Sequence, residues 1–284
     1  MTLISSVLLH FAALLLGALG AMTAGWSGAL CFALEGIMLS GGLAGAMTSH
    51  LPWALSLLTA GAAGTVCALM LGLAVCRGAN PLFGGVAMNG FMAALSMIIA
   101  RLAGGISYSR KTYQLLIGGE NVTVFLPAAL LLLLAMWLLI FHTRWGLRLR
   151  LCGRNGEAAW KAGVRLGGMR ILAWAVCGFL GGIGGLAAMI SLGGGWRMEW
   201  GVGGMGYAAL AALLLGHWRP FRVMLSAALF ALAAAGAEAA AAAGLAVPEG
   251  VFRLLPFLLA LIVLALVGKK DGAPEETAKT ERLE

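Results

Sequence analysis

Long runs of apolar residues constrain the fold of this chain more than any other feature. A helix needs roughly 20 residues to cross the hydrocarbon core of a bilayer. Nine candidate spans, bounded by charged residues, Gly, Pro or Asn, lie near residues 3–22, 28–47, 52–76, 82–103, 122–143, 171–192, 202–216, 223–243 and 252–268. Only 11% of the residues are charged, whereas a soluble domain carries roughly 25%. The sequence therefore predicts an all-α, polytopic transmembrane helix bundle and excludes a disordered chain, a secreted disulfide scaffold and a nucleic-acid-binding protein.

The seventh run, 202–216, is short for a membrane span. Its roughly 15 residues would extend about 22 Å as a helix, against about 30 Å of hydrocarbon. The glycine-rich residues 201–206 lie at its start. We therefore expect a short helix here, broken or re-entrant.

A weak internal similarity appears when the chain is shifted by 176 residues. The shift aligns Gly25, Gly28 and Leu34 with Gly201, Gly204 and Leu210. In the topology given below these segments cross in opposite directions, as in the inverted repeats of many transporters. Chance identity in a sequence rich in Ala, Gly and Leu is the alternative.

Basic residues are concentrated in two places. Residues 144–170, called the basic segment below, hold seven of the 19 Lys and Arg, and residues 269–284 hold four more. Placing the basic segment in the cytoplasm puts 14 of the 19 inside and five outside, in agreement with the positive-inside rule. This predicts an external N-terminus, a transmembrane domain over 1–268 and a charged cytoplasmic tail over 269–284.

The basic segment contains the signals of one very short helix. Asn155 suits the N-cap of a helix, Glu157 suits its first turn, and Gly163 suits its C-terminal end. These positions enclose a helix of about seven residues. Three alanines, whose side chains are only methyl groups, are predicted to leave one face of this helix without large side chains: Ala158, Ala159 and Ala162. A helix of this length is unstable alone in water, so a groove on a partner protein is one explanation. A solvated connector whose arginines bind lipid headgroups is the other.

The same segment carries a specific sequence pattern. It resembles the cytoplasmic loop of ABC-importer permeases that move ribose-type sugars, nucleosides and branched-chain amino acids, with the form T-R-x-G-L-R-L-R-x-x-G-x-N-x-x-A-A-x-x-A-G. The matching residues are Thr143, Arg144, Gly146, Leu147, Arg148, Leu149, Arg150, Gly153, Asn155, Ala158, Ala159, Ala162 and Gly163.

Three further stretches, 27–39, 85–91 and 204–230, are similar to the same family. The last includes the G-x-W-x-P turn, with Trp218 and Pro220 in place. Two features depart from the family pattern. Cys31 replaces the usual Asn of the first stretch, and Gly25 with Trp26 replaces a usual charged pair.

The resemblance implies a subunit of a bacterial inner-membrane importer. Such a permease pairs with a second permease, identical or different, docks ATPase subunits through its coupling loop and receives solute from an external binding protein or lipoprotein. Nucleosides are slightly preferred over simple sugars. The implied coupling residues are Gly153, Asn155, Glu157, Ala158, Ala159, Ala162 and Gly163.

ATP and Mg²⁺ are expected on the partner ATPase subunits, and no cofactor or metal on this chain. The chain lacks the phosphate-binding sequence G-x-x-x-x-G-K-[ST], because Lys270 follows Gly268 and Lys269. The energy for transport must then come from another subunit.

Few polar residues interrupt the predicted spans. An ionisable side chain in hydrocarbon costs on the order of 2.5–3.5 kcal/mol and marks a functional candidate. Glu35 and Asn89 are therefore candidates for lining a translocation path, with a helix-to-helix hydrogen bond as the alternative for each. Trp200, in the predicted outer loop beside Trp196, is a candidate solute contact, and anchoring at the membrane interface is its alternative.

Two other functions compete with an ATP-driven permease. A stand-alone secondary transporter would also use inverted repeats and buried polar groups, although this chain has few carboxylates for ion coupling. Gly25–Gly28 also fits the G-x-S-G motif of an intramembrane serine protease, with Ser27 as nucleophile and His50 or His217 as base. We reject the protease because His50 is predicted about 30 Å from Ser27, and the permease turn already explains His217.

Overall fold

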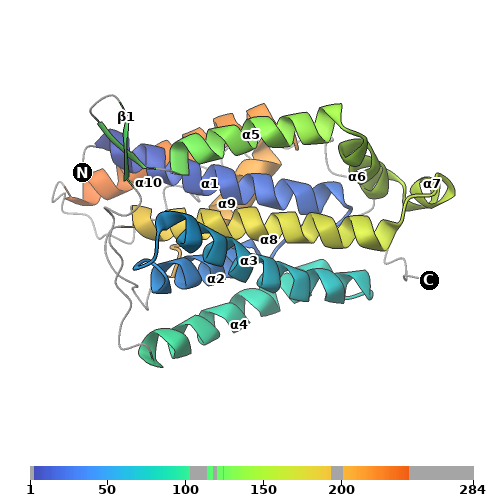
Figure 1. Cartoon of the computed structure of the whole chain (residues 1–284), viewed down its shortest axis with the longest axis horizontal. Coiled ribbons are helices and arrows are strands. Elements are labelled where there is room, and N and C mark those ends of the chain that lie inside the picture. Colours follow the sequence, from blue (N-terminus) through green and yellow to red (C-terminus); the bar gives the residue numbers. More distant parts are fainter. Residues whose placement is uncertain (1–2, 103–113, 118–119, 124, 193–200, 243–284) are drawn as a thin grey trace.

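The computed structural model describes residues 3–102, 114–117, 120–123, 125–192 and 201–242. Within these ranges the protein is a helix bundle with one short antiparallel hairpin (Figure 1). The elements are α1 (Leu3–Trp26), α2 (Leu34–Met47), α3 (Trp53–Cys76), α4 (Pro81–Leu102), β1 (Gln114–Ile117), β2 (Glu120–Thr123), α5 (Phe125–His142), α6 (Arg144–Arg154), α7 (Gly156–Lys161), α8 (Leu166–Ser191), α9 (Met205–Leu215) and α10 (Pro220–Ala242).

The predicted all-α membrane architecture is confirmed. Six described helices are long and apolar enough to cross a membrane: α1, α3, α4, α5, α8 and α10. The predicted short seventh span is α9, whose 11 residues extend about 16 Å. The predicted ninth span, 252–268, and the tail, 269–284, lie outside the described residues.

The prediction for the second span, 28–47, is wrong in its extent. The helix begins only at Leu34 and has 14 residues, or about 21 Å. Residues 27–33 instead form turns and irregular chain, and Gly28 adopts a φ of 101°, which favours glycine. Two described apolar helices, α2 and α9, are therefore too short to cross the bilayer alone, and not only the predicted one.

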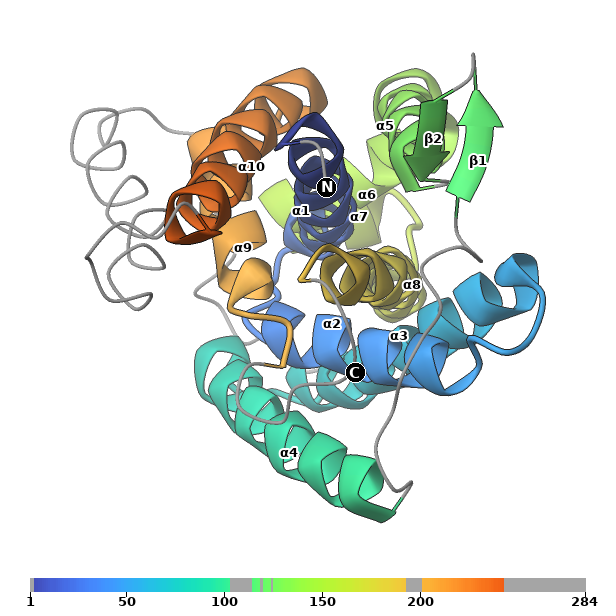
Figure 2. The same cartoon turned by 90° about the vertical axis from the view of Figure 1, so that its left-hand side faces the viewer.

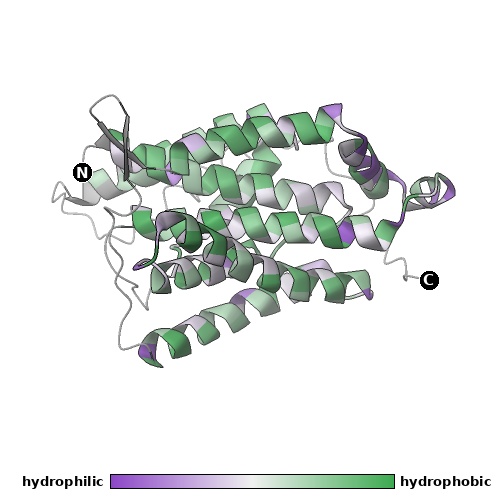
Figure 3. Cartoon of the chain, viewed as in Figure 1, coloured by the Kyte–Doolittle hydropathy of each residue, from purple (hydrophilic) through white to green (hydrophobic). Residues whose placement is uncertain are grey.

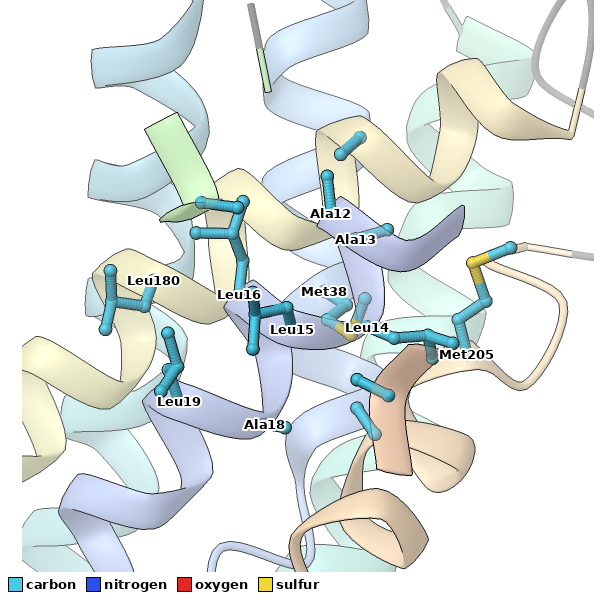
Figure 4. Packing of buried hydrophobic residues seen from close by; sticks show 14 of the residues in the cluster. Ala12, Ala13, Leu14, Leu15, Leu16, Ala18, Leu19, Met38, Leu180 and Met205 are labelled. Carbon is cyan, nitrogen blue, oxygen red and sulfur yellow. The ribbon is translucent and has the colours of Figure 1, made fainter. Parts of the chain in front are cut away.

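Helices α1 and α8 form the centre of the bundle (Figure 2). Most of α1 is buried, whereas α4 stands at the periphery with most of its side chains exposed. Alanine and leucine side chains of α1 pack against Leu180 of α8, Met38 of α2 and Met205 of α9 (Figure 4). The sequence pattern did not indicate which spans are central and which are peripheral, since all the spans are similarly apolar.

Glycines set the spacing of the central helices. A side chain on Gly185 of α8 would overlap the carbonyl oxygen of Met38, and one on Gly41 of α2 would overlap the backbone of Gly182. Lipid provides no hydrophobic drive between spans, so close backbone packing of this kind stabilises membrane bundles. The glycine-rich composition therefore has a structural cause in the contact between α2 and α8.

Replacing Gly185 by alanine is expected to destabilise the protein by about 1–3 kcal/mol, because α2 must move to admit the methyl group. The thermal unfolding midpoint in detergent measures this. Gly236 of α10 is the matched control, since its added methyl group would meet no atom within 4 Å. An unchanged midpoint for Gly185→Ala would contradict the close contact.

The order of helices supports an inverted repeat, but not in the predicted register. Helices α1, α2 and α3 are long, short and long, as are α8, α9 and α10. Each helix of the first set runs opposite to its counterpart in the second (Figure 1). The short helices begin 171 residues apart, at 34 and 205, so the shift of 176 residues misaligns them by five.

Candidate functional site

The basic segment forms a small projection at one end of the bundle (Figure 1). Thr143 caps α6 by accepting a hydrogen bond from the Gly146 N–H at 3.2 Å. Asn155 caps α7 by accepting one from the Ala158 N–H at 2.9 Å. Gly163 ends the helix with a φ of 76°. The predicted short helix and both of its boundary signals are therefore present.

The predicted bare face of α7 is only partly right. Ala158, Ala162 and Gly163 are exposed, but Ala159 is fully buried. The reason is that Ala158 and Ala159 are successive residues and so point to different sides of a helix. Trp160, which the sequence analysis did not select, is 70% exposed. The outer surface of α7 thus combines small residues with one large aromatic ring.

Helix α6 attaches this projection directly to the end of α1. A side chain on Gly153 would overlap the carbonyl oxygen of Trp26 and lie 3.1 Å from the Gly28 nitrogen. From α8, Arg170 Nε donates a hydrogen bond to the Ser27 carbonyl at 3.3 Å. The chain that follows α1 is therefore held by both α6 and α8.

The G-x-W-x-P turn packs at the same place. Trp218 is buried, and its ring occupies the space that a side chain on Gly25 would need. It also meets Trp26 edge to face, with ring centroids 6.3 Å apart. His217 and Trp218 have φ angles of 49° and 59°, a conformation that costs about 1–3 kcal/mol and persists only where packing enforces it. Gly25 departs from the family pattern but is required here by Trp218.

Glu35 joins the two short helices. It lies in the first turn of α2, and its carboxylate accepts hydrogen bonds from the N–H groups of Gly204 at 3.0 Å and Gly206 at 2.7 Å. Those groups form the N-terminus of α9, which favours a bound anion. Gly206 allows this approach, since a side chain there would lie 2.5 Å from the Glu35 Cα. The helix-to-helix bond predicted as one role of Glu35 is present.

Asn89 of α4 makes a second set of contacts to the same region. Its Oδ1 accepts from the Gly36 N–H at 2.8 Å, and its Nδ2 donates to the Phe32 carbonyl at 2.9 Å and to Tyr207 Oη at 3.1 Å. We call Glu35, Gly36, Asn89, Gly206 and Tyr207 the polar cluster. It draws on α2, α4 and α9, and Asn89 lies near the middle of α4.

Tyr207 is the member of the polar cluster that sequence reasoning missed. Its phenol side chain is 47% exposed. A lone tyrosine in an apolar helix belongs to no recognisable sequence pattern. The only signal near it is the glycine-rich stretch 201–206, which marks the start of a short helix. Trp200, the candidate solute contact of the sequence analysis, and Trp196 lie outside the described residues.

The residues proposed for a protease are not brought together. Ser27 Oγ donates to the carbonyl oxygen of Ala24 at 2.6 Å, and His217 Nδ1 lies 2.8 Å from the carbonyl oxygen of Leu215. His50 follows α2 at the opposite end of the bundle from Ser27. Within the described residues, no group of three or more His, Cys, Asp or Glu side chains could hold a metal ion.

Comparison with known proteins covers nearly the whole chain. A family model described as the permease component of branched-chain amino acid transport systems matches residues 3–264. The guanosine ABC transporter permease protein NupQ of Bacillus subtilis (strain 168) is 28% identical over 301 aligned positions, 95% of this chain and 93% of that protein. The nucleoside ABC transporter permease protein NupC of Lactococcus lactis subsp. cremoris (strain MG1363) is 33% identical over 156 positions, 53% of this chain and only 48% of that protein.

Proposed function

Since this multi-pass membrane protein belongs to the family of permease components of branched-chain amino acid transport systems, we propose that it is the permease subunit of an ATP-driven importer for nucleosides. The two relatives named above are permeases for nucleosides and guanosine. The observation that carries the proposal is that two features occur together: the projection formed by α6 and α7 at one end of the bundle, and the polar cluster between α2, α4 and α9.

The polar cluster favours a neutral solute over an amino acid. In many transporters the free N-terminus of a broken helix binds an anionic group of the substrate. Here the N-terminus of α9 is already occupied by the Glu35 carboxylate. The described lysine and arginine residues lie in α6 and α7, near the ends of α4, α8 and α10, or between helices. Figure 3 shows strongly hydrophilic residues gathered at the end of the bundle that carries the projection. Among the described residues, a zwitterionic amino acid would find no cation beside the cluster for its carboxylate, whereas a nucleoside needs none.

The distribution of charge supports the orientation that we propose. Eleven Lys and Arg residues are described, and all but Arg101 lie at or near the end that carries the projection. By the positive-inside rule this end faces the cytoplasm, where α7 can meet an ATPase subunit that holds ATP and Mg²⁺. The N-terminus of the chain then lies outside, and a solute-binding protein approaches that opposite surface. A second permease, a copy or a different chain, completes the membrane part.

The structure offers a short mechanical connection between the projection and the polar cluster. Gly153 at the end of α6 touches the Trp26 carbonyl, and residues 27–33 lead from there to the first turn of α2. Glu35 in that turn holds α9. Movement of α6 by the ATPase would therefore reach both short helices through one segment of chain. A glycine contact transmits such a displacement because the two backbones touch directly, with no side chain between them that could change its conformation.

Gly153→Ala tests this connection. The added methyl group forces α6 away from Trp26. Overpacking of this kind typically costs about 1–3 kcal/mol. A cost of about 1 kcal/mol corresponds to the roughly three- to tenfold fall in uptake that we expect. The ATPase subunit should still co-purify, because the exposed surface of α7 is unchanged. Gly236→Ala is the matched control, and normal uptake by Gly153→Ala would contradict the connection.

Co-purification tests the proposed function itself. The tagged chain, expressed in its host and extracted in mild detergent, is expected to bring down an ATPase subunit in a fixed ratio. Loss of that subunit should abolish uptake in vesicles. If uptake persists without the subunit and without ATP, the chain is a stand-alone secondary transporter and the proposal is wrong.

A further inference from the structure

The hydrogen bonds of the polar cluster leave one donor unused. Asn89 Oδ1 must accept from the Gly36 N–H, and Nδ2 must donate to the Phe32 carbonyl, which fixes the orientation of the amide. The second N–H of Nδ2 then donates to Tyr207 Oη at 3.1 Å. Tyr207 is therefore the acceptor in that contact, and its own O–H is left without an acceptor among the described residues.

The ring of Tyr207 is available as well as its hydroxyl. It is 47% exposed on the N-terminal turn of α9. The backbone below it is fixed, because Glu35 holds the preceding residue, Gly206, and Gly204. A rigid aromatic face next to an orientated O–H donor suits a flat, uncharged ring that carries a hydrogen-bond acceptor at its edge.

We propose that Tyr207 is a specificity-determining residue that contacts the base of the passing nucleoside, its ring against the base and its O–H donating to a base carbonyl. This inference rests on the proposed function, since it names the part of the solute that the polar cluster recognises. Asn89 is a positioning residue in this scheme: it holds the phenol oxygen and leaves the hydrogen pointing to solute.

Two substitutions separate the ring from the hydroxyl. Uptake is measured in vesicles containing the whole importer, at solute concentrations that saturate the external binding protein, for inosine, which has a base carbonyl, and purine riboside, which lacks it. Tyr207→Phe is expected to lower maximal inosine uptake about two- to tenfold, the range of one neutral hydrogen bond, with little change for purine riboside. Tyr207→Leu is expected to lower uptake of both nucleosides. Leu214→Ala, two turns along the same helix and also exposed, should change neither.

A purely structural role for Tyr207 would give a different pattern. Both nucleosides would then lose uptake equally in Tyr207→Phe, together with a lower thermal unfolding midpoint, and that result overturns the inference. Photolabelling of the wild-type importer with 8-azidoinosine gives an independent readout: the label should map to residues near the start of α9 and be displaced by inosine. Labelling confined to other segments also overturns it. If the wild-type importer moves no nucleoside at all, the proposed function has failed rather than the role of Tyr207 alone.

Discussion

Replacing Glu35 by glutamine is expected to reduce ATP-dependent uptake at least tenfold. The carboxylate accepts the N–H groups of Gly204 and Gly206 with its two oxygens. A glutamine amide offers one acceptor, so its NH₂ group would face a backbone donor. Hydrogen bonds to a charged group contribute about 1.5–3 kcal/mol each, and the negative charge that favours the N-terminus of α9 is lost too. The short helices α2 and α9 would then no longer move as one unit.

Glu35→Asp is the matched variant, because it keeps the charge and shortens the side chain by one methylene group. We expect its uptake to lie between that of the wild type and Glu35→Gln. The thermal unfolding midpoint should follow the same order. Wild-type uptake and stability in Glu35→Gln would show that the carboxylate does not hold α9 and would remove the central element of the coupling scheme.

Ala158→Glu is expected to uncouple ATP hydrolysis from transport. Ala158 is exposed on α7, and surface substitutions usually change stability by less than about 0.5 kcal/mol, so the protein should fold. A bulky charge on a surface meant for close contact with a partner must be desolvated or must push the partner away, which costs several kcal/mol where it lacks a counter-charge. Uptake should fall at least tenfold while the ATPase subunit keeps its basal hydrolysis rate.

The controls for Ala158 use the same position. Ala158→Ser adds only a small hydroxyl group and should retain uptake, whereas Ala158→Gln separates bulk from charge. Trp160, an exposed ring on the same short helix, is expected to contribute to the contact with the ATPase. If Ala158→Glu transports normally, α7 faces only water or lipid headgroups, and the alternative role of the basic segment as a solvated connector is correct.

Local signals in the sequence were sufficient to predict the short helix α7 of the projection. Asn155 and Gly163 mark the ends of α7 through their own side-chain and backbone chemistry, and no distant contact is needed to find them. The burial of Ala159 was missed because it depends on how α7 sits against α6 and α8. A pattern of small residues cannot distinguish an inward from an outward alanine.

The polar cluster was predictable only in part. Glu35 and Asn89 stand out because polar side chains in apolar runs are costly. Their meeting with Tyr207 depends on the packing of three helices far apart in the sequence. The late start of α2 was missed for a similar reason. The run 28–47 is apolar throughout, but contacts of Trp26 and Gly28 with α6 and α8 hold residues 27–33 in turns.

Uptake of labelled guanosine by proteoliposomes tests the account most directly. The vesicles contain this chain with its ATPase and any partner permease, ATP and Mg²⁺ inside, and the solute-binding protein outside. The account predicts accumulation that requires internal ATP and is lost when a hydrolysis-deficient ATPase replaces the active one. Accumulation driven by an ion gradient without ATP, or none in the complete system, would contradict it.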